Sequence, residues 1–263
     1  MNPITNTVID VYYRDHIKQS DGMAPLMPLV HICDCYALRG ILSSKAIKPT
    51  MCPVFNEELL YFFYGRPSYR INDGGLSFGS KSMFPVCFII NPAYAVDIKR
   101  IFPFDTGAYY AGLYKDHVHK SAACDDYMFD STYEFIQKYV SMFYGTNTNY
   151  YNGTATIALD KLPVMGFEFQ SLHSLITQQG ACVVDDRSYT IEIQCSGETN
   201  ISNGSVIAVV LPDDIMSDEV LSSFLYDNDI EPITYKSARG APSHITPLII
   251  DLVRNYYEQE GVV

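Results

Sequence analysis

Positive charge is scarce in this sequence: 18 Lys and Arg residues stand against 30 Asp and Glu residues, which leaves a net charge of −12. Proteins that bind nucleic-acid backbones without sequence preference carry basic surfaces, because their affinity comes largely from neutralising phosphates. The overall charge therefore argues against that class of protein. It leaves room for a local basic groove, to which Arg66, Arg70, Lys99 and Arg100 can contribute.

Tryptophan is absent, whereas the chain has 21 Tyr and 14 Phe residues. Most of the tyrosines are expected at strand ends and surface rims, where the ring packs and the hydroxyl reaches water. A few can stack on a flat nucleobase or nicotinamide ring. The hydrophobic content of 48% and the charged content of 18% indicate a chain that folds around a core, not a disordered one.

Targeting and membrane signals are also missing. The first residues have neither a basic region nor an apolar region of the kind that makes a secretory signal. No apolar run approaches the roughly 20 residues that span a bilayer. The seven cysteines are odd in number and lack zinc-ribbon spacing. These absences predict a cytoplasmic protein with reduced thiols, no membrane partner and no bound metal.

The chain has no Gly-x-Gly-x-x-Gly or Walker sequence, which excludes the common phosphate-binding loops. Short strand patterns and helical patterns mix without regular alternation, which favours an α+β fold over a doubly wound parallel sheet. We expect split mixed or antiparallel sheets with flanking helices. Because neither a repeat nor a linker is evident, we predict one domain over residues 1–263, with about 102–153 as a candidate helical or loop insertion.

Hydrophobic periodicity predicts the secondary structure of most of the chain. Helices are expected at 9–18, 36–46 and 131–143. Three more are expected: one that follows residues 167–170 and ends at 178, one from a cap at Ser217 to 226, and one from a cap at Thr246 to 259. Strands are expected at 28–33, 58–64, 86–90, 190–195, 206–211 and 233–235. The polar and aromatic stretch 144–153 is expected to be a loop.

Three polar residues stand at places where a ligand cleft can form. His31 closes the apolar strand 28–33, where its ring can hydrogen-bond a hydroxyl or simply pack under the following helix. Arg66 follows an aromatic strand at a Gly-Arg-Pro turn, where it can pair with a pyrophosphate or stack on a surface tyrosine. Glu192 alternates with isoleucines on a late strand, where it faces either a cleft or solvent.

In this order the three motifs resemble the ADP-ribosyltransferase superfamily, which binds NAD in such a cleft. The aromatic strand and its turn are similar to those of DarT-type toxins, which modify DNA bases. The match is carried by Tyr61, Phe63, Tyr64, Arg66 and Tyr69. The resemblance implies an ADP-ribosyltransferase fold with NAD as its substrate.

The resemblance also implies roles for individual residues. His31 would orient the nicotinamide ribose, with Cys33 at a position where the family usually has Thr or Ser. Arg66 would lie in the NAD site, and Glu192 would stabilise the positive charge that forms as the glycosidic bond breaks. The candidate NAD-binding residues are His31, Cys33, Tyr61, Tyr64, Arg66, Tyr69 and Arg187.

Other residues remain as alternatives for catalysis. Glu168 lies in an alternating Phe-Glu-Phe-Gln sequence and can replace Glu192 as the catalytic carboxylate if that sequence is a strand. His117 and His119 share a face if they are extended, and can then act as an acid and base or as a metal pair; a loop role is favoured.

The leading hypothesis is an NAD-dependent ADP-ribosyltransferase with a macromolecular acceptor, for which nucleic acid is slightly favoured over protein. The resemblance suggests a toxin or defence effector, with an antitoxin or regulatory protein as a partner. One alternative is a non-enzymatic module that senses an NAD-like ligand or binds a protein. Another is an NAD glycohydrolase, in which water is the acceptor.

Overall fold

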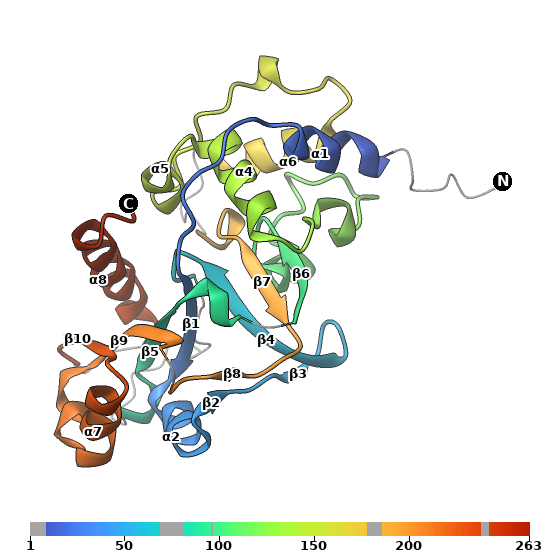
Figure 1. Cartoon of the computed structure of the whole chain (residues 1–263). Coiled ribbons are helices and arrows are strands. Elements are labelled where there is room, and N and C mark those ends of the chain that lie inside the picture. The colour runs from blue at the N-terminus through green and yellow to red at the C-terminus, as the bar shows by residue number, and fades with distance from the viewer. Residues whose placement is uncertain (1–8, 69–80, 96, 178–185, 203, 238–241) are drawn as a thin grey trace. The chain divides into compact units, whose positions relative to one another are not determined.

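The computed structural model describes residues 9–68, 81–95, 97–177, 186–202, 204–237 and 242–263 (Figure 1). The chain forms two compact units. We call residues 1–26, 100–192 and 262–263 the helical unit, and residues 27–99 and 193–261 the sheet unit. The predicted site residue Tyr69 and the predicted cationic residue Arg70 lie outside the described residues.

The sheet unit is built on a sheet with the strand order β10-β9-β5-β1-β4-β7-β6, in which β3 also pairs with β4. Its strands are β1 (Leu29–Asp34), β3 (Thr50–Cys52), β4 (Glu57–Tyr64), β5 (Pro85–Ile90), β6 (Ile98–Phe102), β7 (Glu192–Cys195), β9 (Val206–Pro212) and β10 (Glu231–Tyr235). The strands β2 (Ala46–Ile47) and β8 (Thr199–Asn200) form a second, two-stranded sheet. Two strands, β6 and β7, continue into the helical unit at Arg100 and Glu192.

Apolar side chains explain why β5 and β1 lie inside the sheet. Every residue of β5 is buried, so this strand has no face left for solvent. It pairs antiparallel with β1 over six residues, from Leu29 opposite Ile90 to Asp34 opposite Pro85. The pair β9 and β10 is parallel, which makes the sheet mixed. A mixed sheet with helices confirms the expected α+β class.

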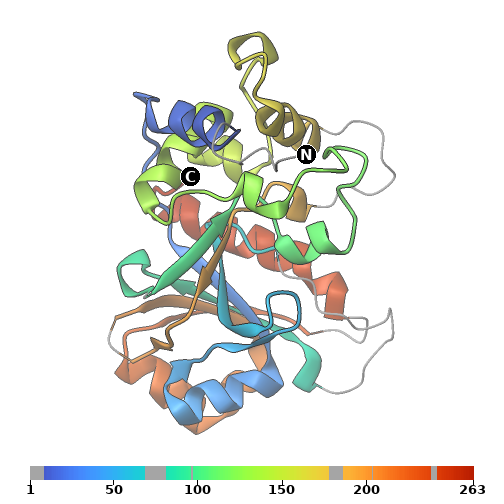
Figure 2. The ribbon, with the colours of Figure 1, turned by 90° about the vertical axis from the view of Figure 1, so that its right-hand side faces the viewer.

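Three helices accompany this sheet: α2 (Cys35–Ser44), α7 (Glu219–Asp227) and α8 (Thr246–Gln259). The Asp34 carboxylate caps α2 by accepting a hydrogen bond from the Ala37 N–H at 2.8 Å. Lys45 ends the same helix in a left-handed conformation, with φ of 53°. Figures 1 and 2 show α2 and α7 close together at the lower end of this unit.

The helical unit contains α1 (Ile9–Lys18), α3 (Thr106–Tyr110), α4 (Tyr133–Tyr144), α5 (Asn147–Tyr151) and α6 (Phe167–Ile176). Its core is aromatic, which explains much of the tyrosine and phenylalanine content. Tyr13 of α1 meets Phe169 of α6 edge to face, with 4.9 Å between ring centroids. Tyr139 of α4 lies 4.7 Å from Phe129 and 4.6 Å from Phe143. Such contacts join α1, α4 and α6, which Figure 1 shows grouped together.

Most predicted elements are present, and four predictions are wrong in detail. The stretch expected to be a loop at 144–153 contains α5, because Thr146 caps a helix by accepting from the Asn149 N–H. The helix expected to begin at a Ser217 cap is capped one residue later, by Asp218. Thr246 is the first residue of α8 and not its cap, because the chain is already in helical conformation at Ile245. Glu168 lies in α6, not in a strand, so the strand placement that made it an alternative to Glu192 is wrong.

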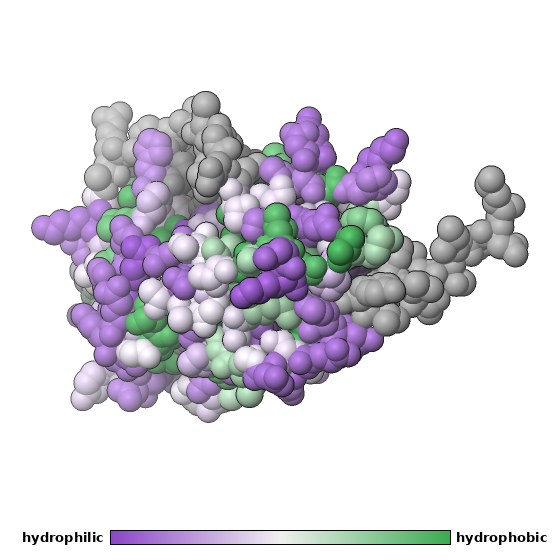
Figure 3. Space-filling model, turned by 90° about the horizontal axis from the view of Figure 1, so that it is seen from above, coloured by the Kyte–Doolittle hydropathy of each residue, from purple (hydrophilic) through white to green (hydrophobic). Residues whose placement is uncertain are grey.

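In the described part of the chain, no helix is long and apolar enough to cross a membrane. Figure 3 shows one face of the molecule, on which hydrophilic residues (purple) interrupt smaller areas of hydrophobic ones (green). This pattern is ordinary for a surface in contact with water.

Candidate active site

Glu192 is the first residue of β7 and is almost fully buried, with only 2% of its surface exposed. Both carboxylate oxygens accept hydrogen bonds from Thr106. The Thr106 hydroxyl donates to Oε1 at 2.7 Å, and the Thr106 backbone N–H donates to Oε2 at 3.1 Å. Thr106 is equally buried, with 2% exposed. Of the two alternatives for Glu192, the one in which it faces solvent is therefore wrong, and its carboxylate is held in a fixed orientation.

The local sequence explains why Thr106 can bond to Glu192 in this way. Thr106 is the first residue of the short helix α3, where backbone N–H groups have no partner within the helix. Asp105 caps that helix by accepting from the Ala108 N–H at 2.7 Å. The Asp105 N–H in turn donates to the Arg187 carbonyl at 3.0 Å. These contacts fix the start of α3 and leave the Thr106 N–H for the Glu192 carboxylate.

Aromatic side chains surround the start of α3. Phe104 stacks on Tyr109 with 5.6 Å between ring centroids and a 4° angle between ring planes. Tyr114 and Tyr127 each lie 5.4 Å from the same Phe104 ring. The pKa of the nearby Cys124 thiol is raised, first by burial and then by the negative charge of Glu192. The Glu192 carboxylate thus lies in an environment from which water is partly excluded, and charges interact strongly there.

His31 lies in β1 of the sheet unit and is half-buried. Its Nδ1 atom lies 2.9 Å from the Tyr61 carbonyl oxygen. A carbonyl oxygen only accepts hydrogen bonds, so Nδ1 carries the proton and donates. Burial lowers the pKa of His31, and the hydrogen bond to the Tyr61 carbonyl opposes that effect. The ring is therefore expected to be neutral near pH 7, with Nε2 as a hydrogen-bond acceptor.

The strand register shows which predicted residues share the His31 side of the sheet. Leu29 of β1 lies opposite Tyr64 of β4, and residues directly opposite in a sheet point to the same face. Since side chains alternate along a strand, His31, Cys33 and Tyr64 share one face. Tyr61 is three residues from Tyr64 and points to the other face. The register therefore brings Tyr64, but not Tyr61, to the His31 face.

Both tyrosine hydroxyls have structural partners. The Tyr64 hydroxyl accepts from the Met27 backbone N–H at 2.9 Å, and burial raises the Tyr64 pKa. The Tyr61 hydroxyl donates to the Cys52 sulfur at 2.9 Å. The pKa of the half-buried Cys33 thiol is raised well above its usual value, mainly by burial. Cys33 is thus a neutral thiol, a weaker hydrogen-bonding group than the Thr or Ser that the resemblance implies.

Arg66 is buried, with only 7% exposed, so the alternative of a surface arginine is wrong. The chain reaches it through Gly65, which has a positive φ of 64°. The Gly65 N–H donates at 2.8 Å to the carbonyl of Pro28, the residue just before β1. This hydrogen bond holds the turn that follows β4 against the start of β1. Glycine adopts this conformation without the steric cost that a side chain brings. The turn predicted from Gly-Arg-Pro is therefore present, and it places the guanidinium inside the protein.

The predicted site residues are divided between the two units. His31, Cys33, Tyr61, Tyr64 and Arg66 belong to the sheet unit, whereas Arg187 and Glu192 belong to the helical unit. Arg187 is half-buried in a 3-10 turn, Asp186–Ser188. Thr106 is the residue that sequence reasoning missed. The Asp105 cap that precedes it was the available signal for a helix start at that point.

His117 and His119 do not form an extended pair. The His117 N–H donates to the Tyr114 carbonyl at 2.9 Å in a turn, and its Nδ1 lies 2.8 Å from the Ser174 hydroxyl. His119 Nδ1 accepts from the Ser121 N–H at 3.2 Å. The favoured loop placement is confirmed. Within the described ranges, no group of three or more His, Cys, Asp or Glu residues could hold a metal ion.

Comparisons with protein-family models, with curated proteins and with solved structures find no significant match to this chain.

Proposed function

We propose that this chain is an ADP-ribosyltransferase that consumes NAD, with Glu192 as its catalytic carboxylate. One observation carries the proposal: a glutamate with 2% exposure whose two oxygens are both held by Thr106. A buried carboxylate aligned in this way is suited to stabilising positive charge on a sugar, because charge interactions are strong where water is excluded. The resemblance of the surrounding motifs to those of ADP-ribosyltransferases supplies the choice of reaction.

The proposed reaction exchanges one bond to the nicotinamide ribose for another. The bond between the ribose and nicotinamide breaks, nicotinamide leaves with the bonding electron pair, and an acceptor nucleophile forms the new bond to the same carbon. Glu192 stabilises the positive charge that builds up on the ribose. His31 accepts a hydrogen bond from a ribose hydroxyl through Nε2, and Arg66 pairs with the pyrophosphate. Tyr61 or Tyr69 is the proposed stacking partner of nicotinamide.

The test is nicotinamide release from NAD, followed by chromatography with and without DNA, RNA or cell lysate. Glu192→Gln is expected to lower the rate about 10²–10³-fold, the effect typical of losing one strong electrostatic contribution. Glu198→Gln is the matched control, because Glu198 is an exposed glutamate six residues further along. A wild-type rate in Glu192→Gln would overturn the role of Glu192. A wild-type protein that binds NAD without releasing nicotinamide under any condition would favour the sensing module.

We propose nucleic acid as the acceptor, on the basis of the aromatic strand and its Arg turn. Of the predicted cationic residues, Lys99 is ion-paired with Glu57 and Arg100 is half-buried. Transfer from labelled NAD should be measured on DNA, RNA and lysate protein across a salt series. Labelling of DNA should fall steeply with salt, because each neutralised phosphate adds roughly 0.9 to the log–log slope. Labelling of protein alone, insensitive to salt, would reverse the choice of acceptor.

A further inference from the structure

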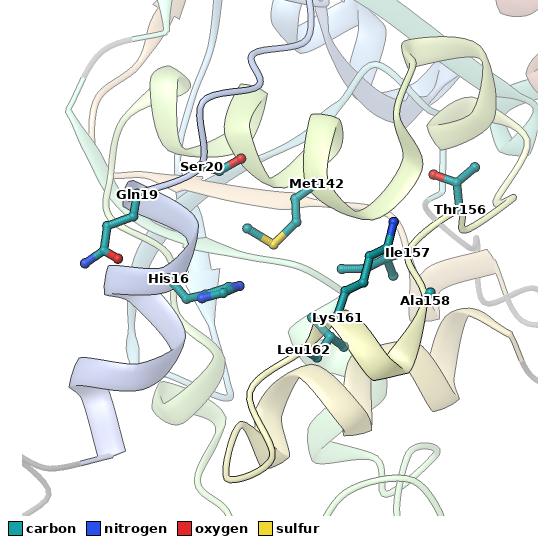
Figure 4. Close-up of a pocket in the computed structure, with 9 residues that line it drawn as sticks. All are labelled: His16, Gln19, Ser20, Met142, Thr156, Ile157, Ala158, Lys161 and Leu162. Atoms are coloured by element: carbon teal, nitrogen blue, oxygen red, sulfur yellow. The ribbon is translucent and has the colours of Figure 1, made fainter.

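A cleft of about 560 Å³ opens within the helical unit, and neither Glu192 nor Thr106 is among the residues that line it. Three parts of the unit surround it: α1 together with Gln19 and Ser20, which follow it; α4; and the segment 156–162 (Figure 4). Clefts of 300–1,000 Å³ are typical of sites for small organic molecules. Nothing in the proposed NAD reaction uses these residues, so the cleft needs an explanation of its own.

The charged groups that line this cleft are basic. His16 and Lys161 are among the lining residues, and no Asp or Glu is among them. This lining contrasts with the net charge of −12 of the whole chain. Two lysines close to α1 are already neutralised, since Lys18 pairs with Asp130 at 2.9 Å and Lys138 pairs with Glu134 at 3.0 Å.

Lys161 differs from those two lysines. Its ammonium group forms no ion pair or hydrogen bond with any residue that the structure describes. The His16 ring is held in place by an edge-to-face contact with Phe169, with 5.3 Å between ring centroids and 74° between ring planes. The cleft therefore presents a positioned imidazole and an available ammonium group. An anion is the ligand group that such a pair recognises.

The rest of the lining is mixed: Gln19, Ser20 and Thr156 are polar, and the other side chains are apolar. Met142, Ile157 and Leu162 supply hydrocarbon and sulfur surface, and Leu162 is buried with 7% exposed. Figure 4 shows His16 and Met142 on one side of the cleft and Lys161 and Leu162 on the other. A ligand with a charged group alone would leave this apolar surface uncovered. A ligand with an apolar body in addition would remove it from water, which contributes roughly 25 cal/mol per Å² buried.

We propose that this cleft binds a small amphipathic anion. Its carboxylate or phosphate group interacts with Lys161 and His16, and its hydrocarbon or aromatic body lies against Met142, Ile157 and Leu162. The proposal is independent of the NAD reaction, because none of these residues belongs to the candidate active site. Carboxylate and phosphate share the recognition chemistry, and the choice between them is made by experiment.

The test uses octanoate, octyl phosphate and octan-1-ol as probes in titration calorimetry. Octanoate or octyl phosphate should bind clearly more tightly than octan-1-ol, which has the same number of carbon atoms but no charge. The tighter of the two anions identifies the preferred head group, and inorganic phosphate alone should bind more weakly than octyl phosphate. The proposal is overturned if the neutral alcohol binds as well as both anions, or if neither anion binds.

Variants assign the binding to this cleft. Lys161→Gln should weaken anion binding about tenfold and should leave octan-1-ol binding unchanged. Lys120→Gln is the matched control, because Lys120 is an exposed lysine of the same unit that does not line the cleft. Ile157→Asn should weaken the binding of all three eight-carbon probes. Equal anion affinity in wild type and Lys161→Gln would overturn the proposal, provided that thermal unfolding shows both proteins folded.

Discussion

The contact between Glu192 and Thr106 can be removed in steps, and the structure predicts the order of the resulting stabilities. Glu192→Gln keeps the shape of the side chain. The amide oxygen of glutamine can accept from the Thr106 N–H, and the amide nitrogen can donate to the Thr106 hydroxyl, which is able to accept. Two neutral hydrogen bonds then replace two charge-assisted ones. We expect the free energy of unfolding to fall by only about 1 kcal/mol.

The other two variants remove partners outright. In Thr106→Val the hydroxyl that bonds to Oε1 at 2.7 Å is replaced by a methyl group of similar size. A buried carboxylate oxygen loses one donor, at a cost of about 1–3 kcal/mol. Glu192→Ala removes the acceptor of two buried donors and also leaves a cavity. Its cost is expected at about 3–5 kcal/mol, because two buried donors lose their acceptor and side-chain packing is lost as well.

Urea unfolding followed by far-ultraviolet circular dichroism measures this order. The transition midpoints should fall from wild type to Glu192→Gln, then Thr106→Val, then Glu192→Ala, with similar m values. The double variant Thr106→Val/Glu192→Ala should lose less than the sum of the single losses, because both changes remove the same contact. Additive losses, or Glu192→Ala as stable as Glu192→Gln, would refute the buried contact. This order also makes Glu192→Gln the right variant for the NAD assay, since its loss of activity would not reflect unfolding.

Four further predictions follow from single positions. The pKa of His31 is lowered on folding. Between that folded pKa and about pH 6.5, the unfolded chain therefore binds more protons than the folded chain. The stability that wild type has above pH 6.5 should therefore fall as the pH drops through the folded pKa, and urea midpoints of His31→Gln should lack this part of the pH dependence. Gly65→Ala should lower the free energy of unfolding by about 1–2 kcal/mol, because φ is +64° and the added carbon would lie 2.6 Å from Met27 Cε; an unchanged midpoint would contradict the turn geometry. Burial raises the pKa of Cys35 to about 12, so iodoacetamide at pH 8 should alkylate this thiol much more slowly in the native than in the unfolded protein, as mass spectrometry of the peptides can show. If Arg66 binds the pyrophosphate as proposed, Arg66→Lys should weaken NAD binding in calorimetry, since an ammonium group does not reproduce the planar fork of guanidinium.

Much of the secondary structure was predictable because its signals are local. The helix at 9–18 was predicted with both its ends, and the strand predicted at 58–64 is β4, Glu57–Tyr64. The apolar run 86–90 predicted β5, whose six residues are all buried. In each case hydrophobic periodicity or an apolar run was bounded by turn or cap residues within a few positions, and no distant contact was needed to decide it.

The errors arose where two local signals competed. The stretch 144–153 is polar and aromatic, which favours a loop. Gly145 nevertheless ends α4 with φ of 76°, and Thr146 then caps α5. Glu168 alternates with aromatic residues over only four positions, which is too short to separate a strand from the first turn of a helix. There the longer helical pattern of α6 prevailed over the short alternation.

The candidate site shows what no local pattern contains. Sequence alternation gave Glu192 a polar face and its isoleucine neighbours an apolar one, but all residues from Thr190 to Cys195 are buried. A strand with neighbours on both sides and cover on both faces buries its polar positions as well, and such positions need partners. One partner of Glu192 is Thr106, 86 residues away, and its identity depends on the tertiary fold. The sequence also left the environment of Arg66 open, because only the tertiary fold decides whether this arginine is buried or at the surface. The most informative residues for function were thus the polar ones that the fold buries, and the sequence identified them without their environment.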